Sequence, residues 1–186
     1  MDNAAPNLRR TDFSRFWVWS GLLLAVVGAA LFVILTPPGW LPKADAIAAA
    51  VCHRIPSHSF FIDEHQLPLC QRCTGTFPGA LTGLLIQWGV WRRRRAQRFP
   101  KWQVFAVLAA FAGMWGLDGL NSYSTMLFGR PEGILGYAPQ PWLRLLTGAL
   151  MGMGMSIVLV PAFNQAMWAD GEAAAPLRSW REFVFL

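Results

Sequence analysis

The sequence predicts an all-α integral membrane protein, a single domain built as a bundle of about four transmembrane helices with an extracytoplasmic loop that carries cysteine and histidine. Three observations predict this fold. Hydrophobic residues make up 54% of the 186 residues and charged residues only 14%, whereas soluble domains carry about 25% charged residues. Four apolar segments are long enough to cross a hydrocarbon core about 30 Å thick. The basic residues are concentrated on one side of these segments.

Residues 16–36 form the first expected span. Arg9 and Arg10 precede it, as they would in a secretory signal, but its length exceeds the usual apolar region of a signal, about 7–15 residues. The segment ends at Pro37 and Pro38 with no convincing small-residue cleavage site. We therefore expect an uncleaved anchor helix.

Three further spans are expected, at residues 74–91, 102–120 and 143–163. Tryptophans flank several of the spans, as at Trp91 and Trp102, and indole rings favour the headgroup level of a bilayer. The third span can extend toward residue 128.

Small residues recur at a spacing of four on two of the expected spans. They are Gly75, Gly79 and Gly83 on the second span, and Gly148 and Gly152 on the fourth. Such ridges let helix backbones approach closely in lipid. We expect ordinary packing within the bundle rather than a specific dimer motif.

The distribution of basic residues predicts the orientation. With four spans, both termini and the loop 92–101 share one side, which holds 11 of the 16 lysines and arginines, while the other side holds four. Because cytoplasmic loops carry the basic excess, we expect both termini in the cytoplasm and the loop 37–73 outside, in a multi-pass protein of the bacterial plasma membrane. Residues 169–186 are expected to form a flexible tail.

All three cysteines and all three histidines fall within one 22-residue segment of the loop 37–73. They are Cys52, His53, His58, His65, Cys70 and Cys73. Thiolate and imidazole are the ligands that zinc and other soft or borderline ions prefer. The CxxC spacing of the last two cysteines lets one tight turn direct both sulfurs at the same ion.

The sequence therefore predicts a site for zinc or another divalent, thiolate-preferring metal ion, with Cys52, His53, Cys70 and Cys73 as ligands. His58 is an alternative fourth ligand. His65 is a further candidate for that position.

Two other interpretations of the cysteines stay open. Disulfides persist on the oxidising side of a membrane, so Cys70 and Cys73 can be a redox pair, with Arg72 and the start of a helix lowering a thiol pKa. Alternatively, Cys52 pairs with one of them as a structural disulfide. A c-type haem is disfavoured, because Thr74 stands where its attachment motif needs histidine.

These residues resemble the pattern of the DUF2085 family of predicted membrane proteins. The matching positions are Cys52, His53, Pro56, Ser59, residues 68–70, residues 72–75, Asp118, Gly119, Arg144, Thr147 and Gly148. The resemblance covers roughly residues 45–155 and implies a membrane protein without assigning it an activity. His58 stands where the family pattern usually has arginine, which implies either an added ligand or a lost anion contact.

Two charged residues fall inside the expected spans, Asp118 late in the third and Arg144 early in the fourth. Ionisable groups within a span are costly, and they are usually paired or face a cavity. We expect these two to form an ion pair in a polar pocket beneath the cysteine loop, joined by Asn121 and Thr147. The alternative is that both lie at the interface and extend their charged ends toward water.

The leading functional hypothesis is metal binding at the Cys/His site. A membrane thiol–disulfide redox protein and a non-catalytic subunit of a membrane complex are the alternatives. The expected partners are the lipid bilayer and either other membrane proteins or further copies of the chain. Despite the net charge of +6, we expect no nucleic-acid binding, because the basic residues cluster between apolar segments.

Overall fold

The computed structural model describes residues 8–168, 175–176 and 182, with side chains from residue 15 onward. The chain divides into two compact units, Met1–Val51 and Cys52–Leu186. Most of the expected tail 169–186 lies outside the described residues. The same holds for the side chains of Arg9, Arg10, Arg178 and Arg181, which belong to the charge argument for orientation.

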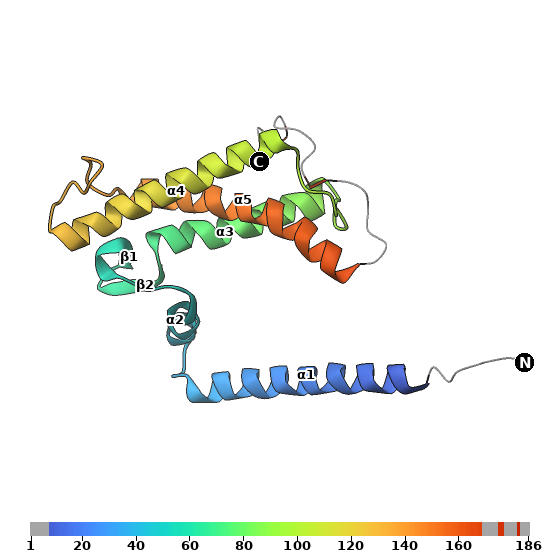
Figure 1. Ribbon diagram of the computed structural model, residues 1–186. Helices are drawn as coiled ribbons and strands as arrows, with labels where there is room; N and C mark the ends of the chain where they lie inside the picture. The colour runs from blue at the N-terminus through green and yellow to red at the C-terminus, as the bar shows by residue number, and fades with distance from the viewer. Residues whose placement is uncertain (1–7, 169–174, 177–181, 183–186) are drawn as a thin grey trace, which may run out of the picture. The chain divides into compact units, whose positions relative to one another are not determined.

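The first unit contains the long helix α1 (Leu8–Leu35) and the shorter helix α2 (Trp40–Val51) (Figure 1). The portion Arg15–Leu35 is long and apolar enough to cross a membrane, as expected for the first span. The ammonium group of Lys43 on α2 donates to the carbonyl oxygen of Val33 at 3.2 Å and to Oγ1 of Thr36 at 3.1 Å. Lys43 thereby satisfies a carbonyl that the end of α1 leaves without a helical partner.

The second unit begins with a small hairpin that the sequence analysis did not anticipate within the loop 37–73. A 3-10 turn (Pro56–His58) leads into strand β1 (Ser59–Ile62), which pairs antiparallel with β2 (His65–Cys70). Its register places Ser59 opposite Cys70. The expected loop 37–73 therefore contains regular secondary structure in both units, α2 in the first and the hairpin in the second.

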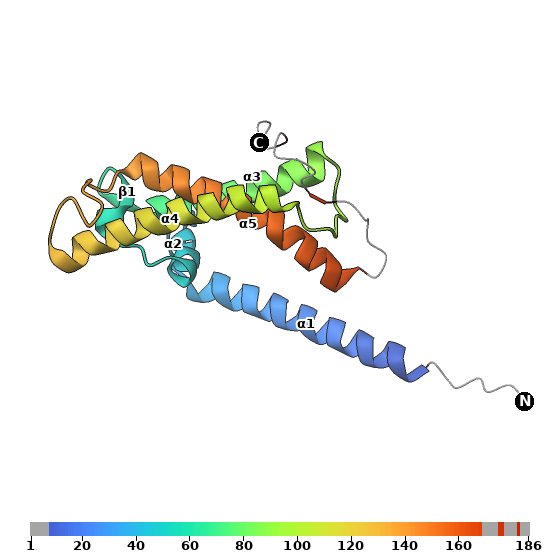
Figure 2. The same cartoon turned by 45° about the horizontal axis from the view of Figure 1, so that its top comes forward.

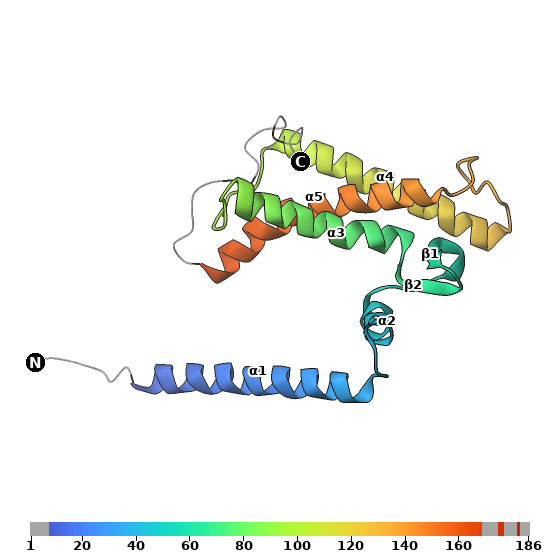
Figure 3. The ribbon, with the colours of Figure 1, turned by 180° about the vertical axis from the view of Figure 1, so that it is seen from behind.

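Three long helical segments follow the hairpin. They are α3 (Gln71–Leu85), continued by the π-helical turn η2 (Ile86–Val90), then α4 (Trp102–Phe128) and α5 (Pro141–Met167). Helix α5 packs against both α3 and α4, and the hairpin lies at the end of the bundle where α3 begins (Figures 2 and 3).

Three helices of the described chain are long and apolar enough to cross a membrane: the portion of α1 from Arg15, α4 and α5. The expected second span, 74–91, corresponds to α3 and η2, which do not meet that description. The structure thus supports three of the four expected spans.

Glycines bring α3 and α5 into backbone contact. A Cβ added at Gly75 or Gly79 would fall on the carbonyl oxygen of Leu145 or Ala149. Reciprocally, a Cβ at Gly148 or Gly152 would fall on a carbonyl oxygen of α3. The predicted packing of these glycines within the bundle is therefore confirmed. It sets the position of the first turn of α3 relative to α5.

Side-chain amides connect α5 to the segment before α4 and to η2 at the other end of the bundle. The amide of Asn164 on α5 donates to the carbonyl oxygens of Arg94 and Ala96 at 3.0 and 2.9 Å. Deeper in the bundle, the fully buried Gln87 donates to Oγ of Ser156 at 3.0 Å.

Candidate functional site

Three sulfur atoms meet at the start of α3. The Sγ atoms of Cys52, Cys70 and Cys73 all lie within 4.8 Å of one another. The side chain of Cys52 is buried and the other two are half-buried, and all three are free thiols. The structure thus brings together the three cysteines that the sequence grouped as ligands.

Backbone amides hold the sulfur of Cys52 in place. The N–H groups of Cys70 and Arg54 donate to this Sγ at 3.4 and 3.5 Å. Arg54 adopts a left-handed conformation with φ +48°, which turns the chain back toward the hairpin directly after Cys52. The amide of Gln66 holds this turn by donating to the carbonyl oxygen of Arg54 at 2.8 Å and to Oγ of Ser59 at 2.9 Å.

The electrostatics of the three thiols are unequal. Burial favours the neutral thiol of Cys52, but the N–H groups of Cys70 and Arg54, together with the thiols of Cys70 and Cys73, outweigh it and lower the pKa of Cys52 below its usual value. Cys73 lies in the first turn of α3, and its side chain is half-buried. Three sulfurs this close repel one another as thiolates, and a bound cation removes that repulsion.

The histidines lie outside the group of three sulfurs. No imidazole nitrogen of His53, His58 or His65 falls within the cluster that the structure forms from its described residues. His53 and His65 are exposed, and His58 is half-buried. Burial lowers the pKa of His58, and the charges of Arg144 and Arg72 lower it further. His58 is therefore predominantly neutral near pH 7.

A polar network lies next to the sulfurs. Arg72 extends from the first turn of α3 to form an ion pair with Asp118 of α4, and its guanidinium carbon lies 5.4 Å from the ring centroid of Trp115. The hydroxyl of Tyr137 donates to the other carboxylate oxygen of Asp118 at 3.2 Å. Asp118 itself is only 3% exposed.

The expected ion pair between Asp118 and Arg144 is therefore corrected, because Asp118 pairs with Arg72. Arg144 instead donates to Oε1 of Gln71 at 3.2 Å and to the hydroxyl of Ser122. The sequence analysis placed Arg72 in the loop before the second span, whereas α3 already begins at Gln71. This early start directs Arg72 into the bundle.

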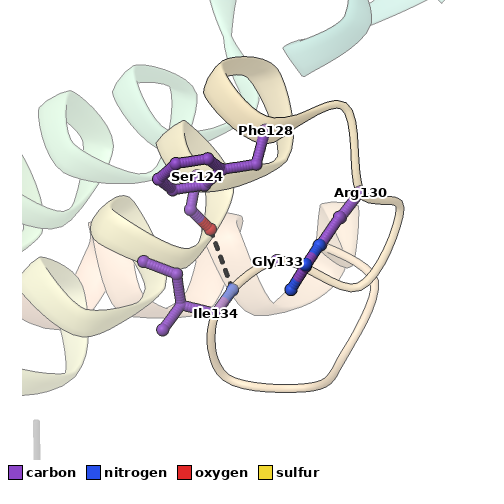
Figure 4. A pocket seen from close by; sticks show the side chains of 5 residues that line it. All are labelled: Ser124, Phe128, Arg130, Gly133 and Ile134. Atoms are coloured by element: carbon purple, nitrogen blue, oxygen red, sulfur yellow. Dashed lines mark hydrogen bonds between the residues drawn. The ribbon is translucent and has the colours of Figure 1, made fainter.

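The loop between α4 and α5 completes this end of the bundle. Asn121 donates to the carbonyl oxygen of Tyr137 at 2.9 Å and accepts from the N–H of Leu135 at 2.8 Å. The N–H of Ile134 donates to Oγ of Ser124 at 2.9 Å, beside a cavity of about 470 Å³ that is also lined by Arg130 (Figure 4). These bonds position the Tyr137 hydroxyl over Asp118.

Several residues of the site were missed by sequence reasoning. Gln66, Gln71, Ser122 and Tyr137 are single polar residues with no motif spacing. The one available signal was the polarity of Gln71 and Ser122 next to positions already singled out. Thr147, expected in the polar pocket, bonds only to carbonyl oxygens of its own helix in the contacts observed.

Comparison with known proteins relates the chain to a family of predicted membrane proteins. The family model described as "Predicted membrane protein (DUF2085)" matches residues 52–158. The chain is similar to an uncharacterized protein of Methanocaldococcus jannaschii, 28% identical over 123 residues that cover 66% of this chain and 70% of the relative.

A second similarity is shorter. An uncharacterized protein of Methanothermobacter thermautotrophicus is 46% identical over 35 residues, which cover 19% of this chain and 32% of that relative. Both organisms are archaea, so the bacterial origin expected from the sequence gains no support from these relatives. No solved structure matches the chain.

Proposed function

The chain belongs to the DUF2085 family of predicted membrane proteins, and from that premise we propose that it binds a divalent, thiolate-preferring metal ion such as zinc at the end of its helix bundle. The observation that carries this proposal is the convergence of three free thiols, with Sγ atoms within 4.8 Å of one another. Cys52, Cys70 and Cys73 are the proposed ligands.

The donor set fits such an ion. Sulfurs bound tetrahedrally to zinc at about 2.3 Å lie roughly 3.8 Å apart, so the observed group needs only a small closure to reach that spacing. The N–H donors to Cys52 support its thiolate form, as hydrogen bonds to ligand sulfurs do in metal sites. Cys73 lies in the first turn of α3, where the helix dipole also favours negative charge.

Three protein ligands leave a fourth position for water, a small molecule or a histidine. His53 is the proposed protein ligand because it neighbours Cys52, and His58 is the alternative. Either imidazole has to move toward the sulfurs on metal binding, whereas the cysteines are already gathered. We therefore expect the cysteines to contribute more to affinity than either histidine.

Metal analysis of the purified protein tests the proposal. Protein isolated in mild detergent with zinc in the medium should carry about one ion per chain, and each Cys→Ser variant should lose most of it, because every missing ligand opens the shell. Ser57→Ala, an exposed change in the same segment, is the matched control and should retain the metal. Metal-free wild-type protein with three free thiols would contradict the proposal.

Thiol–disulfide exchange is the second candidate function. The same proximity of sulfurs favours it, since any two of the three thiols are near enough to form a bond after a small shift. In that case the purified protein would contain a Cys70–Cys73 or Cys52–Cys70 disulfide that a reductant opens reversibly, and no stoichiometric metal. Mass spectrometry with and without thiol alkylation separates the two functions.

We further propose that α3 and η2 together form a fourth span. Residues 71–90 are continuously helical, and about 20 residues at 1.5 Å each reach roughly 30 Å. With four spans, the excess of basic residues favours cytoplasmic termini and an outer side for the hairpin with Cys52 and Cys70, with Cys73 in the first turn of the span. A topology reporter fused after Leu186 should then read as cytoplasmic and one near Gly39 as external; the opposite readout would contradict the orientation.

A further inference from the structure

The polar network beside the sulfurs contains an excess of positive charge. Arg72 and Arg144 contribute two guanidinium groups, and among the residues that the structure describes, Asp118 is the one carboxylate within ion-pair distance of either. Arg144 and Asp118 are each 3% exposed, and the side chain of Arg72 is 21% exposed. The other hydrogen-bond partners are neutral amide and hydroxyl groups.

Both guanidinium groups also have unused hydrogen-bonding capacity. The Nε atoms of Arg72 and Arg144 are buried and have no hydrogen-bond partner. A buried positive charge without a counter-charge is unfavourable. Asp118 balances only one of the two arginines, so the network is most stable beside a further negative charge.

The three thiols at the same end of the bundle can supply that charge as thiolates. Gln71 lies between Cys70 and Arg72 in the chain, is 5% exposed, and accepts a hydrogen bond from Arg144. The same amide donates to the carbonyl oxygen of Ser59 at 3.3 Å, and Ser59 is the hairpin partner of Cys70. The side chain of Gln71 thus connects Arg144 to Ser59, the residue that pairs with Cys70 in the hairpin.

We propose that Arg72, Asp118 and Arg144 form the counter-charge of a divalent metal–trithiolate centre, with Arg144 setting its affinity. This inference rests on the proposed metal function. Binding a divalent ion to three thiols releases three protons to solvent and leaves a centre of charge −1. The centre then balances the +1 of the network, whereas three thiols, or one disulfide and one thiol, leave that +1 uncompensated.

Substitution of Arg144 tests the inference through metal affinity. The probe is Cd²⁺, titrated into detergent-purified full-length protein at fixed pH against a competing chelator and followed by the sulfur-to-cadmium charge-transfer absorbance. Arg144→Gln should weaken binding by about 10- to 100-fold, the usual effect of removing a group that supports metal ligands. Arg144→Lys should recover most of the affinity, because it restores the charge. Arg130→Gln, which removes an exposed arginine from the same end of the bundle, should bind as the wild type does.

A change of opposite sign separates a charge effect from a merely structural one. Asp118→Asn removes a negative charge next to the anionic centre and keeps the shape of the side chain. If the network acts by charge, this variant should bind Cd²⁺ more tightly than the wild type, and its metal uptake should shift to lower pH. If the residues only hold the fold together, Asp118→Asn and Arg144→Gln should both weaken binding.

Each outcome decides one question. Wild-type protein that binds no Cd²⁺ would refute the proposed metal function itself. Binding that is normal in the wild type and equal in Arg144→Gln and Arg130→Gln would refute the counter-charge alone. If Arg144→Gln does not yield monodisperse protein, Arg72→Gln takes its place with the same expected weakening, and the direction of the Asp118→Asn effect remains decisive.

Discussion

Helices α1 and α5 have nearly the same length, 28 and 27 residues, yet they use it differently. Within the most apolar part of α1 no residue is buried, whereas 44% of the corresponding part of α5 is buried. The buried positions of α5 include Arg144, Gly148, Gly152, Ser156 and Asn164. The more apolar helix is therefore the one with no buried residue in its most apolar part.

This difference reflects the solvent. In water, apolar side chains are buried because exposure is costly, but lipid solvates them as well as a protein interior does. Helices in a membrane therefore associate through close backbone packing and polar contacts. In this chain, small and polar residues mark the surfaces where helices meet, and a continuous apolar surface marks a helix available to lipid or to another protein.

Enlarging a glycine should give the largest contrast between the two helices. Gly152→Leu on α5 directs a side chain into the backbone of α3, where even a Cβ would fall on the carbonyl oxygen of Thr76. We expect a loss of about 3 kcal/mol or more in the free energy of unfolding and little folded protein. Gly21→Leu on α1 has no atom within 4 Å of the added Cβ, and should fold normally. Yields of monodisperse protein in detergent measure both, and equal yields would break the comparison.

The same contrast explains what the sequence predicted well. Long apolar runs are visible locally, so an apolar helix long enough to cross a membrane was expected in each of the segments that form α1, α4 and α5. The glycine spacing of four likewise predicted a packing ridge, which the contacts between α3 and α5 confirm. The cysteine group was predictable because Cys70 and Cys73 share one turn, and because the third cysteine, Cys52, falls in the same 22-residue segment.

The features that the sequence did not predict depend on residues far apart in the chain. The pairing of Asp118 could not be chosen from depth alone, because two arginines lie at the same end of the bundle and only the early start of α3 brings Arg72 within reach. The hairpin was missed because four- and six-residue strands carry almost no periodic signal. Tyr137 reaches the network only because Asn121 holds its loop.

Removing a buried amide should have an intermediate effect. Asn164→Leu on α5 removes the donors to the carbonyl oxygens of Arg94 and Ala96, and leaves those oxygens without that partner at a cost of about 1–3 kcal/mol in the free energy of unfolding. Leucine is favoured by lipid, so hydrophobicity alone predicts stabilisation. Ser20→Leu on α1 removes only a local bond to the carbonyl oxygen of Trp17. We expect the thermal midpoint in detergent to fall for the first variant and to hold or rise for the second; a fall in both would show that α1 also depends on polar contacts.

Acidification should produce the smallest effect, and it tests the positive charge of the site without altering an arginine. Burial, Arg144 and Arg72 lower the pKa of His58, so the folded protein binds this proton more weakly than the unfolded chain does. Folding favours the neutral form of His58. Its contribution to stability is complete above the unfolded pKa of about 6.5 and is lost as pH falls from there through the lower folded value.

Thermal midpoints measured across this window, with a chelator present so that protons do not compete for metal, should therefore decline as pH falls. His58→Gln should decline less steeply and match the wild type at pH 8, because glutamine acquires no charge there. Parallel curves for the two proteins would mean that folding does not lower the pKa of His58, so that neither burial nor the two arginines act on it in the metal-free protein.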